Sequence, residues 1–410
     1  MPKPETVVVV GAGIAGLSTA FHLAEKQISR VILLDKGDVG SGSSSRSGAV
    51  NTMLMATPSA TRARGISFDI FERFNRILDD YDFHQDGCAA ILNPAQLASA
   101  SELHEMQRAA GARIEVLDRR AVERRFPDLV LKEDEHGVLD LRGGWSEPDR
   151  YIPALACHIR GMGVEVREHQ TVEDFILEGG SVVGVRTREN GELHAGAVVC
   201  TVNAWANSLL RRVDQPLPVR SFTHERFVTR PLGQAPRLPA VNDDATGVYY
   251  RPTEAPGLLL GSGAIEPEQI DPGPDFDLAS LAPAEESLPF ILEAVRDRLP
   301  LMQDAEIDYH RVGLVSYPID FQPNIGPVAA LPGLFLGTNF CSGGFGHHPM
   351  AGRLLAEYVA DGQTTFDGSD FDPDRWKEFD TEGYLAQAIS HSDMVEARAA
   401  TTKGFVRKKH

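Results

Sequence analysis

The sequence has few cysteines, a shortage of positive charge and no long apolar run, and each of these excludes a class of protein. The cysteines number four and are scattered without the spacing of metal ligands: Cys88, Cys157, Cys200 and Cys341. We therefore predict no metal site, and free thiols in a reducing cytoplasm rather than a disulfide framework.

The balance of charge is strongly acidic. Lysine and arginine number 40 against 58 aspartates and glutamates, a formal net charge of −18, so nucleic acid and anionic membranes are not expected partners. No apolar run has the length that crosses a bilayer, and the first predicted strand begins within a few residues of Met1, which leaves no space for a signal peptide. We predict a cytoplasmic protein with one large core or two intimate domains.

A nucleotide-binding pattern occupies the start of the chain. The β-branched run Thr6–Val10 is typical of a buried parallel strand, and the string Gly11-Ala12-Gly13-Ile14-Ala15-Gly16 leads from it into a helical pattern. Gly11 permits a tight turn, Gly13 lets the backbone approach a pyrophosphate, and Gly16 lets helix and strand pack closely. The free N–H groups at the helix start then face the phosphates.

A second apolar strand, Val31–Leu34, ends in Asp35, at the spacing where an acid holds a ribose hydroxyl. A glycine-rich turn with an empty site is the alternative explanation of such a pattern. Strand, glycines, helix, strand and acid occur here in the required order, so we predict a nucleotide cofactor.

The stretch Gly40–Ala49 is rich in serine and glycine and could be a flexible linker by composition alone. Its place directly after the ribose acid favours a cofactor-binding loop, in which small residues let backbone N–H groups approach a phosphate or a flat ring. We expect Arg46 to anchor this serine loop or a phosphate rather than to act in catalysis.

Composition divides the chain into interleaved domains, because residues 216–310 are rich in proline and acid and carry short strands typical of an antiparallel sheet. The predicted nucleotide-binding domain takes residues 1–90, 145–215 and 311–365. The predicted substrate domain takes residues 91–144 and 216–310. The tail, residues 366–410, is charged, and its end at Gly404–His410 is expected to fray.

Six motifs follow one another along the chain: Val10–Leu17, the Gly40–Ala49 loop, Val198–Ala206, Tyr249–Pro252, Tyr317–Asp320 with Asn324–Gly326, and Gly343–Phe345 before the last helix. Together they resemble the D-amino acid oxidase / sarcosine oxidase superfamily of FAD-dependent oxidoreductases. The pattern is most similar to its sarcosine/dimethylglycine/proline-dehydrogenase-like branch, whose substrate-domain strand resembles Thr223–Thr229. The resemblance implies an α/β fold with a Rossmann-like FAD-binding domain of the glutathione-reductase type and an inserted antiparallel-sheet substrate domain.

The resemblance also implies an extended FAD. Its isoalloxazine would lie between Ser43–Gly48 and Gly343–His347, where the start of a helix stabilises the negative charge of the reduced ring. The implied cofactor-binding residues are Gly11, Ala12, Gly13, Ile14, Ala15, Gly16, Asp35, Lys36, Gly42, Ser43, Arg46, Ser47, Gly48, Val172, Asn203, Trp205, Gly343, Gly344, Phe345, Gly346 and His347.

Departures from the family pattern bear on cofactor and substrate. Members with covalent flavin carry a cysteine near Gly313–Val315 or a histidine in the serine loop, and this chain has neither, so non-covalent FAD is predicted. Gly346 stands where monomeric sarcosine oxidases place a lysine that binds the substrate carboxylate. The strand Leu258–Leu260 lacks their oxygen-activating lysine, and the glycine oxidase arginine near Val315 is missing too. The electron acceptor could be O2, a quinone or a partner protein, with a dehydrogenase slightly favoured.

Four residues are candidates for orienting an amine and pairing with a carboxylate: His224, Tyr250, Arg251 and His347. Tyr250 and Arg251 are neighbours on one predicted strand, so they face opposite sides and at most one lines the site. The alternatives are a helix-cap role for His347 and a solvent-facing position for His224. His348 is a weaker candidate than its neighbour.

We therefore predict an enzyme that oxidises the C–N bond of an amino acid or a secondary or N-methyl amine to an imine, by hydride transfer to flavin N5. A D-amino acid dehydrogenase, or the catalytic β subunit of a hetero-oligomeric proline, sarcosine or opine oxidoreductase, is the alternative among enzymes. A non-catalytic FAD-binding assembly or electron-transfer subunit is the alternative from another class. Homo- and hetero-oligomers both stay open.

Overall fold

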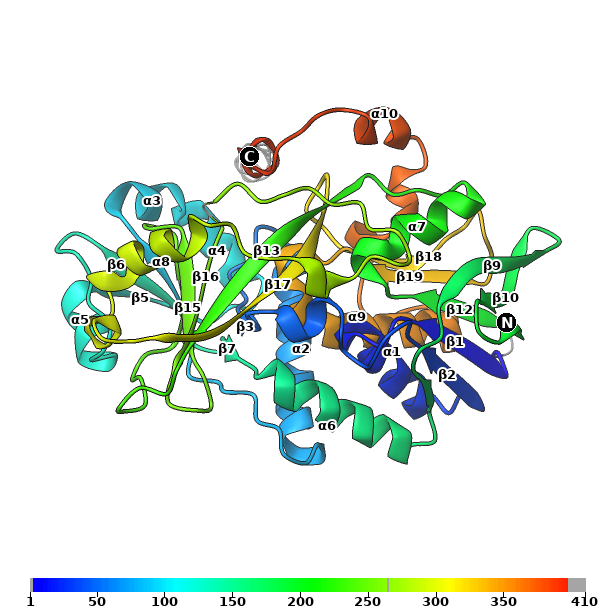
Figure 1. Cartoon of the computed structure of the whole chain (residues 1–410), viewed down its shortest axis with the longest axis horizontal. Coiled ribbons are helices and arrows are strands. Elements are labelled where there is room, and N and C mark those ends of the chain that lie inside the picture. Colours follow the sequence, from blue (N-terminus) through cyan, green and yellow to red (C-terminus); the bar gives the residue numbers. More distant parts are fainter. Residues whose placement is uncertain (1–2, 264, 397–410) are drawn as a thin grey trace.

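The computed structural model describes residues 3–263 and 265–396, so the prediction for Gly404–His410 lies outside the described residues. Two sheets of different construction form the two halves of the molecule. The long strands β13 (Val219–Thr229) and β17 (Ile307–Pro318) run from one half to the other (Figure 1). Within the described ranges, no helix combines the length and the apolarity needed to cross a membrane.

The nucleotide-binding half is built on a six-stranded sheet of order β18-β19-β12-β1-β2-β8, in which all neighbours are parallel except β18 and β19. Its strands are β1 (Thr6–Val10), β2 (Arg30–Leu34), β8 (Glu165–Arg167), β12 (Ala197–Cys200), β18 (Asn324–Pro327) and β19 (Leu334–Thr338). Covered on both faces, these strands need no polar side, which explains the unbroken apolar runs of β1 and β2.

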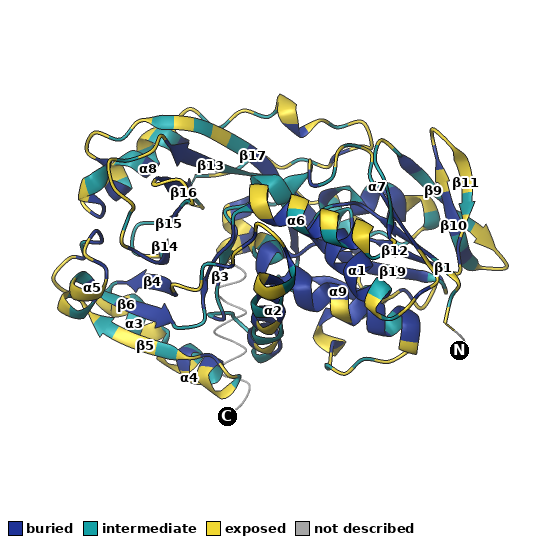
Figure 2. Ribbon diagram, turned by 90° about the horizontal axis from the view of Figure 1, so that it is seen from below, coloured by how far each residue is buried: buried dark blue, intermediate teal, exposed yellow. Residues whose placement is uncertain are grey.

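Two layers cover this sheet. Val7 and Val9 face a layer of helices, namely α1 (Ile14–Glu25), α2 (Pro58–Ile77), α6 (Pro148–Gly161) and α9 (Gly344–Asp361). Val8 and Val10 face a three-stranded antiparallel sheet made of β9 (Val172–Glu178), β10 (Ser181–Thr187) and β11 (Gly191–His194). Figure 2 shows α1, α9 and β1 almost wholly buried, while the edge strand β11 is exposed.

The substrate half is built on an eight-stranded sheet of order β17-β13-β16-β15-β14-β4-β6-β5, antiparallel except between β14 and β4. Besides β13 and β17 its strands are β4 (Cys88–Leu92), β5 (Ile114–Asp118), β6 (His136–Asp140), β14 (Ala240–Asp243), β15 (Val248–Pro252) and β16 (Leu258–Ser262). The domain boundaries predicted at residues 90 and 310 fall inside β4 and β17, and therefore cut through this sheet.

Three helices pack against the substrate sheet and complete its core, namely α3 (Pro94–Ser99), α5 (Arg119–Arg125) and α8 (Ser287–Arg296), while α4 (Ser101–Ala109) packs against α3 and α2 (Figure 1). The described part of the tail, residues 366–396, first packs on the nucleotide-binding half, where Phe371 joins its core and Trp376 donates to Asn324 of β18 at 3.0 Å, and then attaches to the substrate half. Arg220 of β13 donates to the carbonyl oxygen of Tyr384 within α10 (Thr381–Leu385) at 2.6 Å and to that of Gln387 after it at 2.7 Å. The tail then reaches the cavity described below, where His391 lies on the wall.

Candidate active site

A cavity of about 1190 Å³ lies where the two halves meet. Its wall comes from the β1–α1 turn, the serine loop and the start of α9 on one side, and from β13, β15 and β17 on the other. This volume exceeds the ~300–1,000 Å³ of an ordinary small-molecule pocket. The cavity therefore has room for a dinucleotide together with a small substrate.

The turn between β1 and α1 forms one end of the cavity. Gly11 has a φ of +100°, which glycine adopts readily. Helix α1 begins after Gly13, which has no side chain to cap it, and Ile14 is the residue of its first turn whose N–H has a side-chain partner among the described residues. A Cβ on Gly13 would lie 2.9 Å from Oγ of Ser44, which accepts a hydrogen bond from the N–H of Ile14 at 3.1 Å. The serine loop thus closes on the glycine turn as a phosphate cradle requires.

Ala12 and Gly16 lie in the glycine string but do not line the cavity. A Cβ on Gly16 would lie 1.8 Å from the carbonyl oxygen of Gly11, so this residue lets helix and strand approach each other. The N–H of Ala12 donates to Oδ2 of Asp35 at 2.7 Å, and the N–H of Gly37 donates to Oδ1 at 2.9 Å. Burial raises the pKa of Asp35, and these backbone bonds oppose that effect while they fix the carboxylate beside the cavity.

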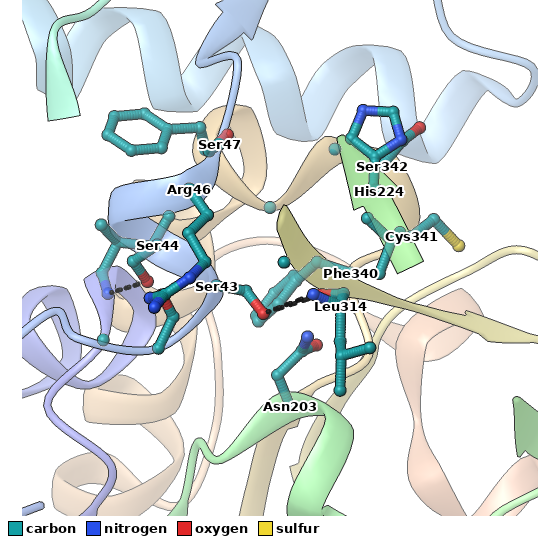
Figure 3. A pocket seen from close by; sticks show the side chains of 18 of the residues that line it. Ser43, Ser44, Arg46, Ser47, Asn203, His224, Leu314, Phe340, Cys341 and Ser342 are labelled. Atoms are coloured by element: carbon teal, nitrogen blue, oxygen red, sulfur yellow. Dashed lines mark hydrogen bonds between the residues drawn. The ribbon is translucent and has the colours of Figure 1, made fainter. Parts of the chain in front are cut away.

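The serine loop is tied to the substrate half and to itself. Oγ of Ser43 donates to the carbonyl oxygen of Leu314 on β17 at 2.8 Å and accepts from its N–H at 3.2 Å (Figure 3). Nη1 of Arg46 donates to the carbonyl oxygens of Ser41 and, at 3.0 Å, of Gly42. The guanidinium folds back on its own loop, which agrees with the anchoring role expected for Arg46. Ser47 and Gly48 continue this wall of the cavity.

The start of α9 forms another part of the cavity wall, and its lining residues are Gly343, Gly344, Phe345 and His347. The helix has no side-chain cap, so free N–H groups and the positive end of its dipole lie beside the cavity. Nδ1 of His347 has no hydrogen-bond partner in the described part of the chain. Burial, with a contribution from Arg64, lowers the pKa of His347 well below its usual value, so its ring is neutral.

His348 lies in the core behind this wall. Its Nδ1 is 2.8 Å from the carbonyl oxygen of Phe345, which can only accept, so Nδ1 carries the proton. Nε2 then accepts from the hydroxyl of Tyr151 at 2.7 Å. Burial lowers the pKa of His348 to about 3. The residue does not line the cavity, and its role is structural.

Four more predicted cofactor residues line the cavity around the end of β2: Lys36, Val172, Asn203 and Trp205. Nζ of Lys36 lies 4.5 Å from the ring centroid of Trp205 and donates to the carbonyl oxygens of Pro274 and Phe276. Oδ1 of Asn203 accepts from the N–H of Asn339 at 3.1 Å. Gly346 is the remaining predicted residue that does not line the cavity; it lies against Arg64.

In the substrate half, His224 of β13 and Tyr249 of β15 line the cavity together. Nε2 of His224 lies 3.1 Å from Oη of Tyr249, and the two rings are stacked at 11°. Cβ atoms on Gly48 and Gly261 would come within 2.7 and 2.2 Å of the phenol ring, so the absence of a side chain at these glycines leaves the space that the ring occupies. Burial, with a contribution from His391, lowers the pKa of His224 to about 4, and burial raises the pKa of Tyr249 to about 12. Both side chains are therefore neutral near pH 7.

Tyr250 and Arg251 do not line the cavity, so their prediction as site residues is wrong. The pleat of β15 turns Tyr250 away from Tyr249 and into the core of the substrate half. Arg251 shares the face of Tyr249, but its Nη1 bonds to Oε2 of Glu147 at 3.1 Å and its Nε to the carbonyl oxygen of Gly48 at 2.6 Å. These partners hold it behind the serine loop.

Sequence reasoning missed Tyr249 and Arg64. Tyr249 could have been found, because two tyrosines follow each other on the strand and only one of them can face the cavity. Arg64 of α2 is buried and lines the cavity. Its sequence pattern could have indicated this position. Arg64 precedes Phe68 by four residues and Phe71 by seven, a spacing that puts a basic residue on the buried face of the helix.

Comparison with known proteins decides the family, since the family described as FAD dependent oxidoreductase (DAO) matches residues 6–358. The chain belongs to this family. Membership confirms the predicted α/β fold class, the predicted FAD cofactor and the prediction of an oxidoreductase. The residues present fit FAD, because the glycine turn, the fixed carboxylate of Asp35 and two uncapped helix starts line one continuous cavity.

Family relatives differ in length from this chain. It is 27% identical to 4-methylaminobutanoate oxidase (formaldehyde-forming) of Paenarthrobacter nicotinovorans over 92% of this chain, but spans only 46% of that relative. Glycine oxidase of Pseudomonas putida is 28% identical, with 90% of this chain and 98% of the relative covered. The structure of L-proline dehydrogenase from P. horikoshii superposes with a TM-score of 0.84 at 24% identity, covering 92% and 99% of the two chains, and it supports the fold.

Proposed function

We propose that this member of the FAD-dependent oxidoreductase family oxidises the C–N bond of an amino acid or a secondary or N-methyl amine to an imine. The observation that carries the proposal is the hydrogen-bonded pair His224–Tyr249, which lines the same cavity as the uncapped start of α9. Relatives named for glycine, 4-methylaminobutanoate and proline support this substrate class.

The residues that would hold FAD come from the nucleotide-binding half. The turn at Gly11–Gly13 and the start of α1 would hold the pyrophosphate, and Asp35 the ribose. The serine loop and the residues from Gly343 would enclose the isoalloxazine. Bound FAD supplies the acceptor for a hydride and its two electrons.

The pair His224–Tyr249 would orient the substrate amine. Because the phenol is protonated and the imidazole neutral, the hydroxyl of Tyr249 can donate to Nε2 of His224 while Oη accepts from the substrate N–H. Imine formation requires a free lone pair on the nitrogen: the lone pair forms the C=N bond as the α C–H bond breaks and the hydride leaves. His224 is too weak a base to hold an ammonium proton, so the amine must lose that proton to solvent before it is bound.

The test is an anaerobic titration of the purified protein, followed by its visible spectrum. The panel comprises sarcosine, N,N-dimethylglycine, L- and D-proline, several D-amino acids and an opine. Bleaching of the flavin band near ~450 nm by one class would support the proposal and name the class. Readmitted air then separates an oxidase, which regains colour quickly, from a dehydrogenase.

Two results would contradict the proposal. A yellow protein that no amine bleaches, and that elutes with a partner protein, would favour a non-catalytic FAD-binding subunit. A protein that stays colourless after FAD is added would show that the glycine turn and the start of α9 do not form a cofactor site. Size-exclusion chromatography of the same sample distinguishes a homo-oligomer from a hetero-oligomer.

A further inference from the structure

Arg64 is a buried cation that occupies space left by two glycines of another helix. It lies on α2 and is only 3% exposed. A Cβ on Gly346 would lie 1.2 Å from its Nη1, and a Cβ on Gly343 would lie 2.2 Å from its Nη2. The guanidinium is therefore seated in the first turn of α9, and only glycine at these two positions admits it.

Among the described residues, no carboxylate forms an ion pair with this guanidinium. Nε and Nη1 of Arg64 are buried and have no hydrogen-bond partner among the described residues. Cys88 and the carboxylate of Asp140 are the acidic groups that act on it. Burial raises the pKa of the Cys88 thiol, so it stays neutral, and the carboxylate already accepts from the N–H of Met53 at 2.6 Å and from the hydroxyl of Thr52 at 3.1 Å. A buried charge that lacks a counter-ion is costly, so a partner from outside the chain is expected.

The unpaired side chain faces the cavity. Arg64 lines it beside His347, whose ring is neutral, and near Met55, which lies just ahead of α2. Burial lowers the pKa of Arg64 to about 10, which still leaves it charged at neutral pH. A forked donor of fixed charge at the edge of a cavity matches a carboxylate, which it can bind through two parallel hydrogen bonds.

We propose that Arg64 binds the carboxylate of the substrate and so restricts this chain to amino acids and N-alkyl amino acids. The inference rests on the proposed function and deepens it, because it names the acidic substrate class of the same cavity. In this arrangement the cation that binds the anion comes from α2 instead of from a side chain at position 346. Glycine at position 346 leaves the space that the guanidinium of Arg64 needs. Amines without a carboxylate would leave Arg64 unpaired and would bind weakly.

The first experiment measures binding alone, in the holoenzyme. Acetate and its neutral analogue acetamide are titrated while the flavin difference spectrum is recorded, for the unaltered protein and for Arg64→Met, Arg64→Lys and Arg62→Met. We expect Arg64→Met to raise the Kd for acetate at least about tenfold, since a charge-assisted bond is lost, with Arg64→Lys in between. Arg62 is exposed on the same helix, so Arg62→Met should leave the Kd unchanged.

A rescue variant tests the geometry. In Arg64→Met combined with Gly346→Lys, the new side chain starts where the guanidinium was, and acetate binding should be partly restored. If Arg64→Met fails to fold, Arg64→Lys and this double variant still decide the matter. An unchanged acetate Kd in all of them would overturn the proposal.

The flavin midpoint potential and a pair of substrates separate the remaining possibilities. A shifted potential or lost FAD in Arg64→Met, with the preference for acetate over acetamide retained, would show that Arg64 serves the cofactor and would overturn the proposal. If no amine reduces the unaltered protein but acetate still binds through Arg64, the carboxylate site stands and the proposed function fails. Equal reduction by sarcosine and by dimethylamine would refute the restriction to acids.

Discussion

The two sides of the cavity are built by different means. On the nucleotide side, the surface is mostly backbone: a glycine turn, two helix starts without caps, and a carboxylate fixed by two N–H groups. The polar groups expected to meet the substrate are side chains of distant elements, with His224 on β13 and Tyr249 on β15 in the substrate half and Arg64 on α2 in the nucleotide-binding half. Backbone sites need glycine at fixed spacing and are visible in a sequence. Sites made of side chains depend on which face of an element is turned inward.

The largest effect should come from a substitution on the nucleotide side of the cavity, where the wall is mostly backbone. Gly16→Ala places a Cβ 1.8 Å from the carbonyl oxygen of Gly11, a backbone atom that cannot move aside without displacing α1. We expect the purified variant to retain little or no FAD, as measured by the ratio of visible to ultraviolet absorbance. Gly161→Ala is the control, because no atom lies within 4 Å of its Cβ. Full flavin content in Gly16→Ala would refute the close packing.

The second prediction concerns a side chain on the substrate side of the cavity, whose substitution should leave FAD bound. Tyr249→Phe should slow flavin reduction by the best substrate about 10- to 100-fold, because one oriented hydrogen bond contributes about 1–3 kcal/mol. Tyr250→Phe is the matched control at the adjacent position. Its ring is buried in the core and faces away from the cavity, so the rate should stay within about twofold of the unaltered protein. Equal losses in the two variants would contradict the assignment of faces.

The third prediction concerns the effect of acid on the stability of the protein, through the buried side chain of His348 in α9. The pKa of His348 is about 3 in the folded protein and about 6.5 once unfolded. Between these values the unfolded chain binds a proton that the folded chain excludes, so stability rises with pH and is lost as pH falls from 6.5 toward 3. Urea unfolding should show that His348→Gln has a lower free energy of unfolding than the unaltered protein at pH 7. The difference between the two proteins should be smaller at pH 5.

The control for this titration is Leu177→Gln, at an exposed position of β9 that carries no titratable group. Its stability difference from the unaltered protein should be the same at both pH values. A gap for His348→Gln that does not narrow at pH 5 would show that the His348 ring is not held neutral by its surroundings.

The smallest effect is expected at the tail. The carboxylate of Glu266 accepts from the N–H groups of His391 at 2.7 Å and of Ser392, and so holds the tail against the cavity wall. Glu266→Ala should raise KM about two- to threefold without changing FAD content, since the bonds that are lost are exposed or only partly buried and lie far from the glycine turn in sequence. Glu268→Ala, two positions away, is the control. A change in flavin content would mean that this part of the tail supports the cofactor side instead.

What could be predicted from the sequence follows the same division. Gly11, Gly13, Asp35 and the serine loop were identified, because turn geometry and spacing constrain them locally. On the substrate side His224 was identified and does line the cavity, whereas Tyr250 and Arg251 were chosen in place of Tyr249. The register of an antiparallel strand is set by its neighbours along the sheet, here β14 and β16, and no local pattern reveals it.

Arg64 could not be assigned for a related reason. Its place depends on contact between α2 and the first turn of α9, elements separated by most of the chain. From the sequence alone, the glycine at position 346 indicates only that a side chain is missing there. Only the fold shows that this loss opens space for a charge from another helix.

The order in which the six-stranded sheet is joined has a consequence for biosynthesis. β1 pairs with β12, and β12 pairs with β19, so the six-stranded sheet that contains the strand made first is complete only after residue 338 has left the ribosome. The second helix start at the cavity belongs to α9, which is made later still. A nascent chain therefore carries a half-formed cradle until α9 has been made, and we expect capture of FAD to follow as the event that joins the glycine turn after β1 to the start of α9.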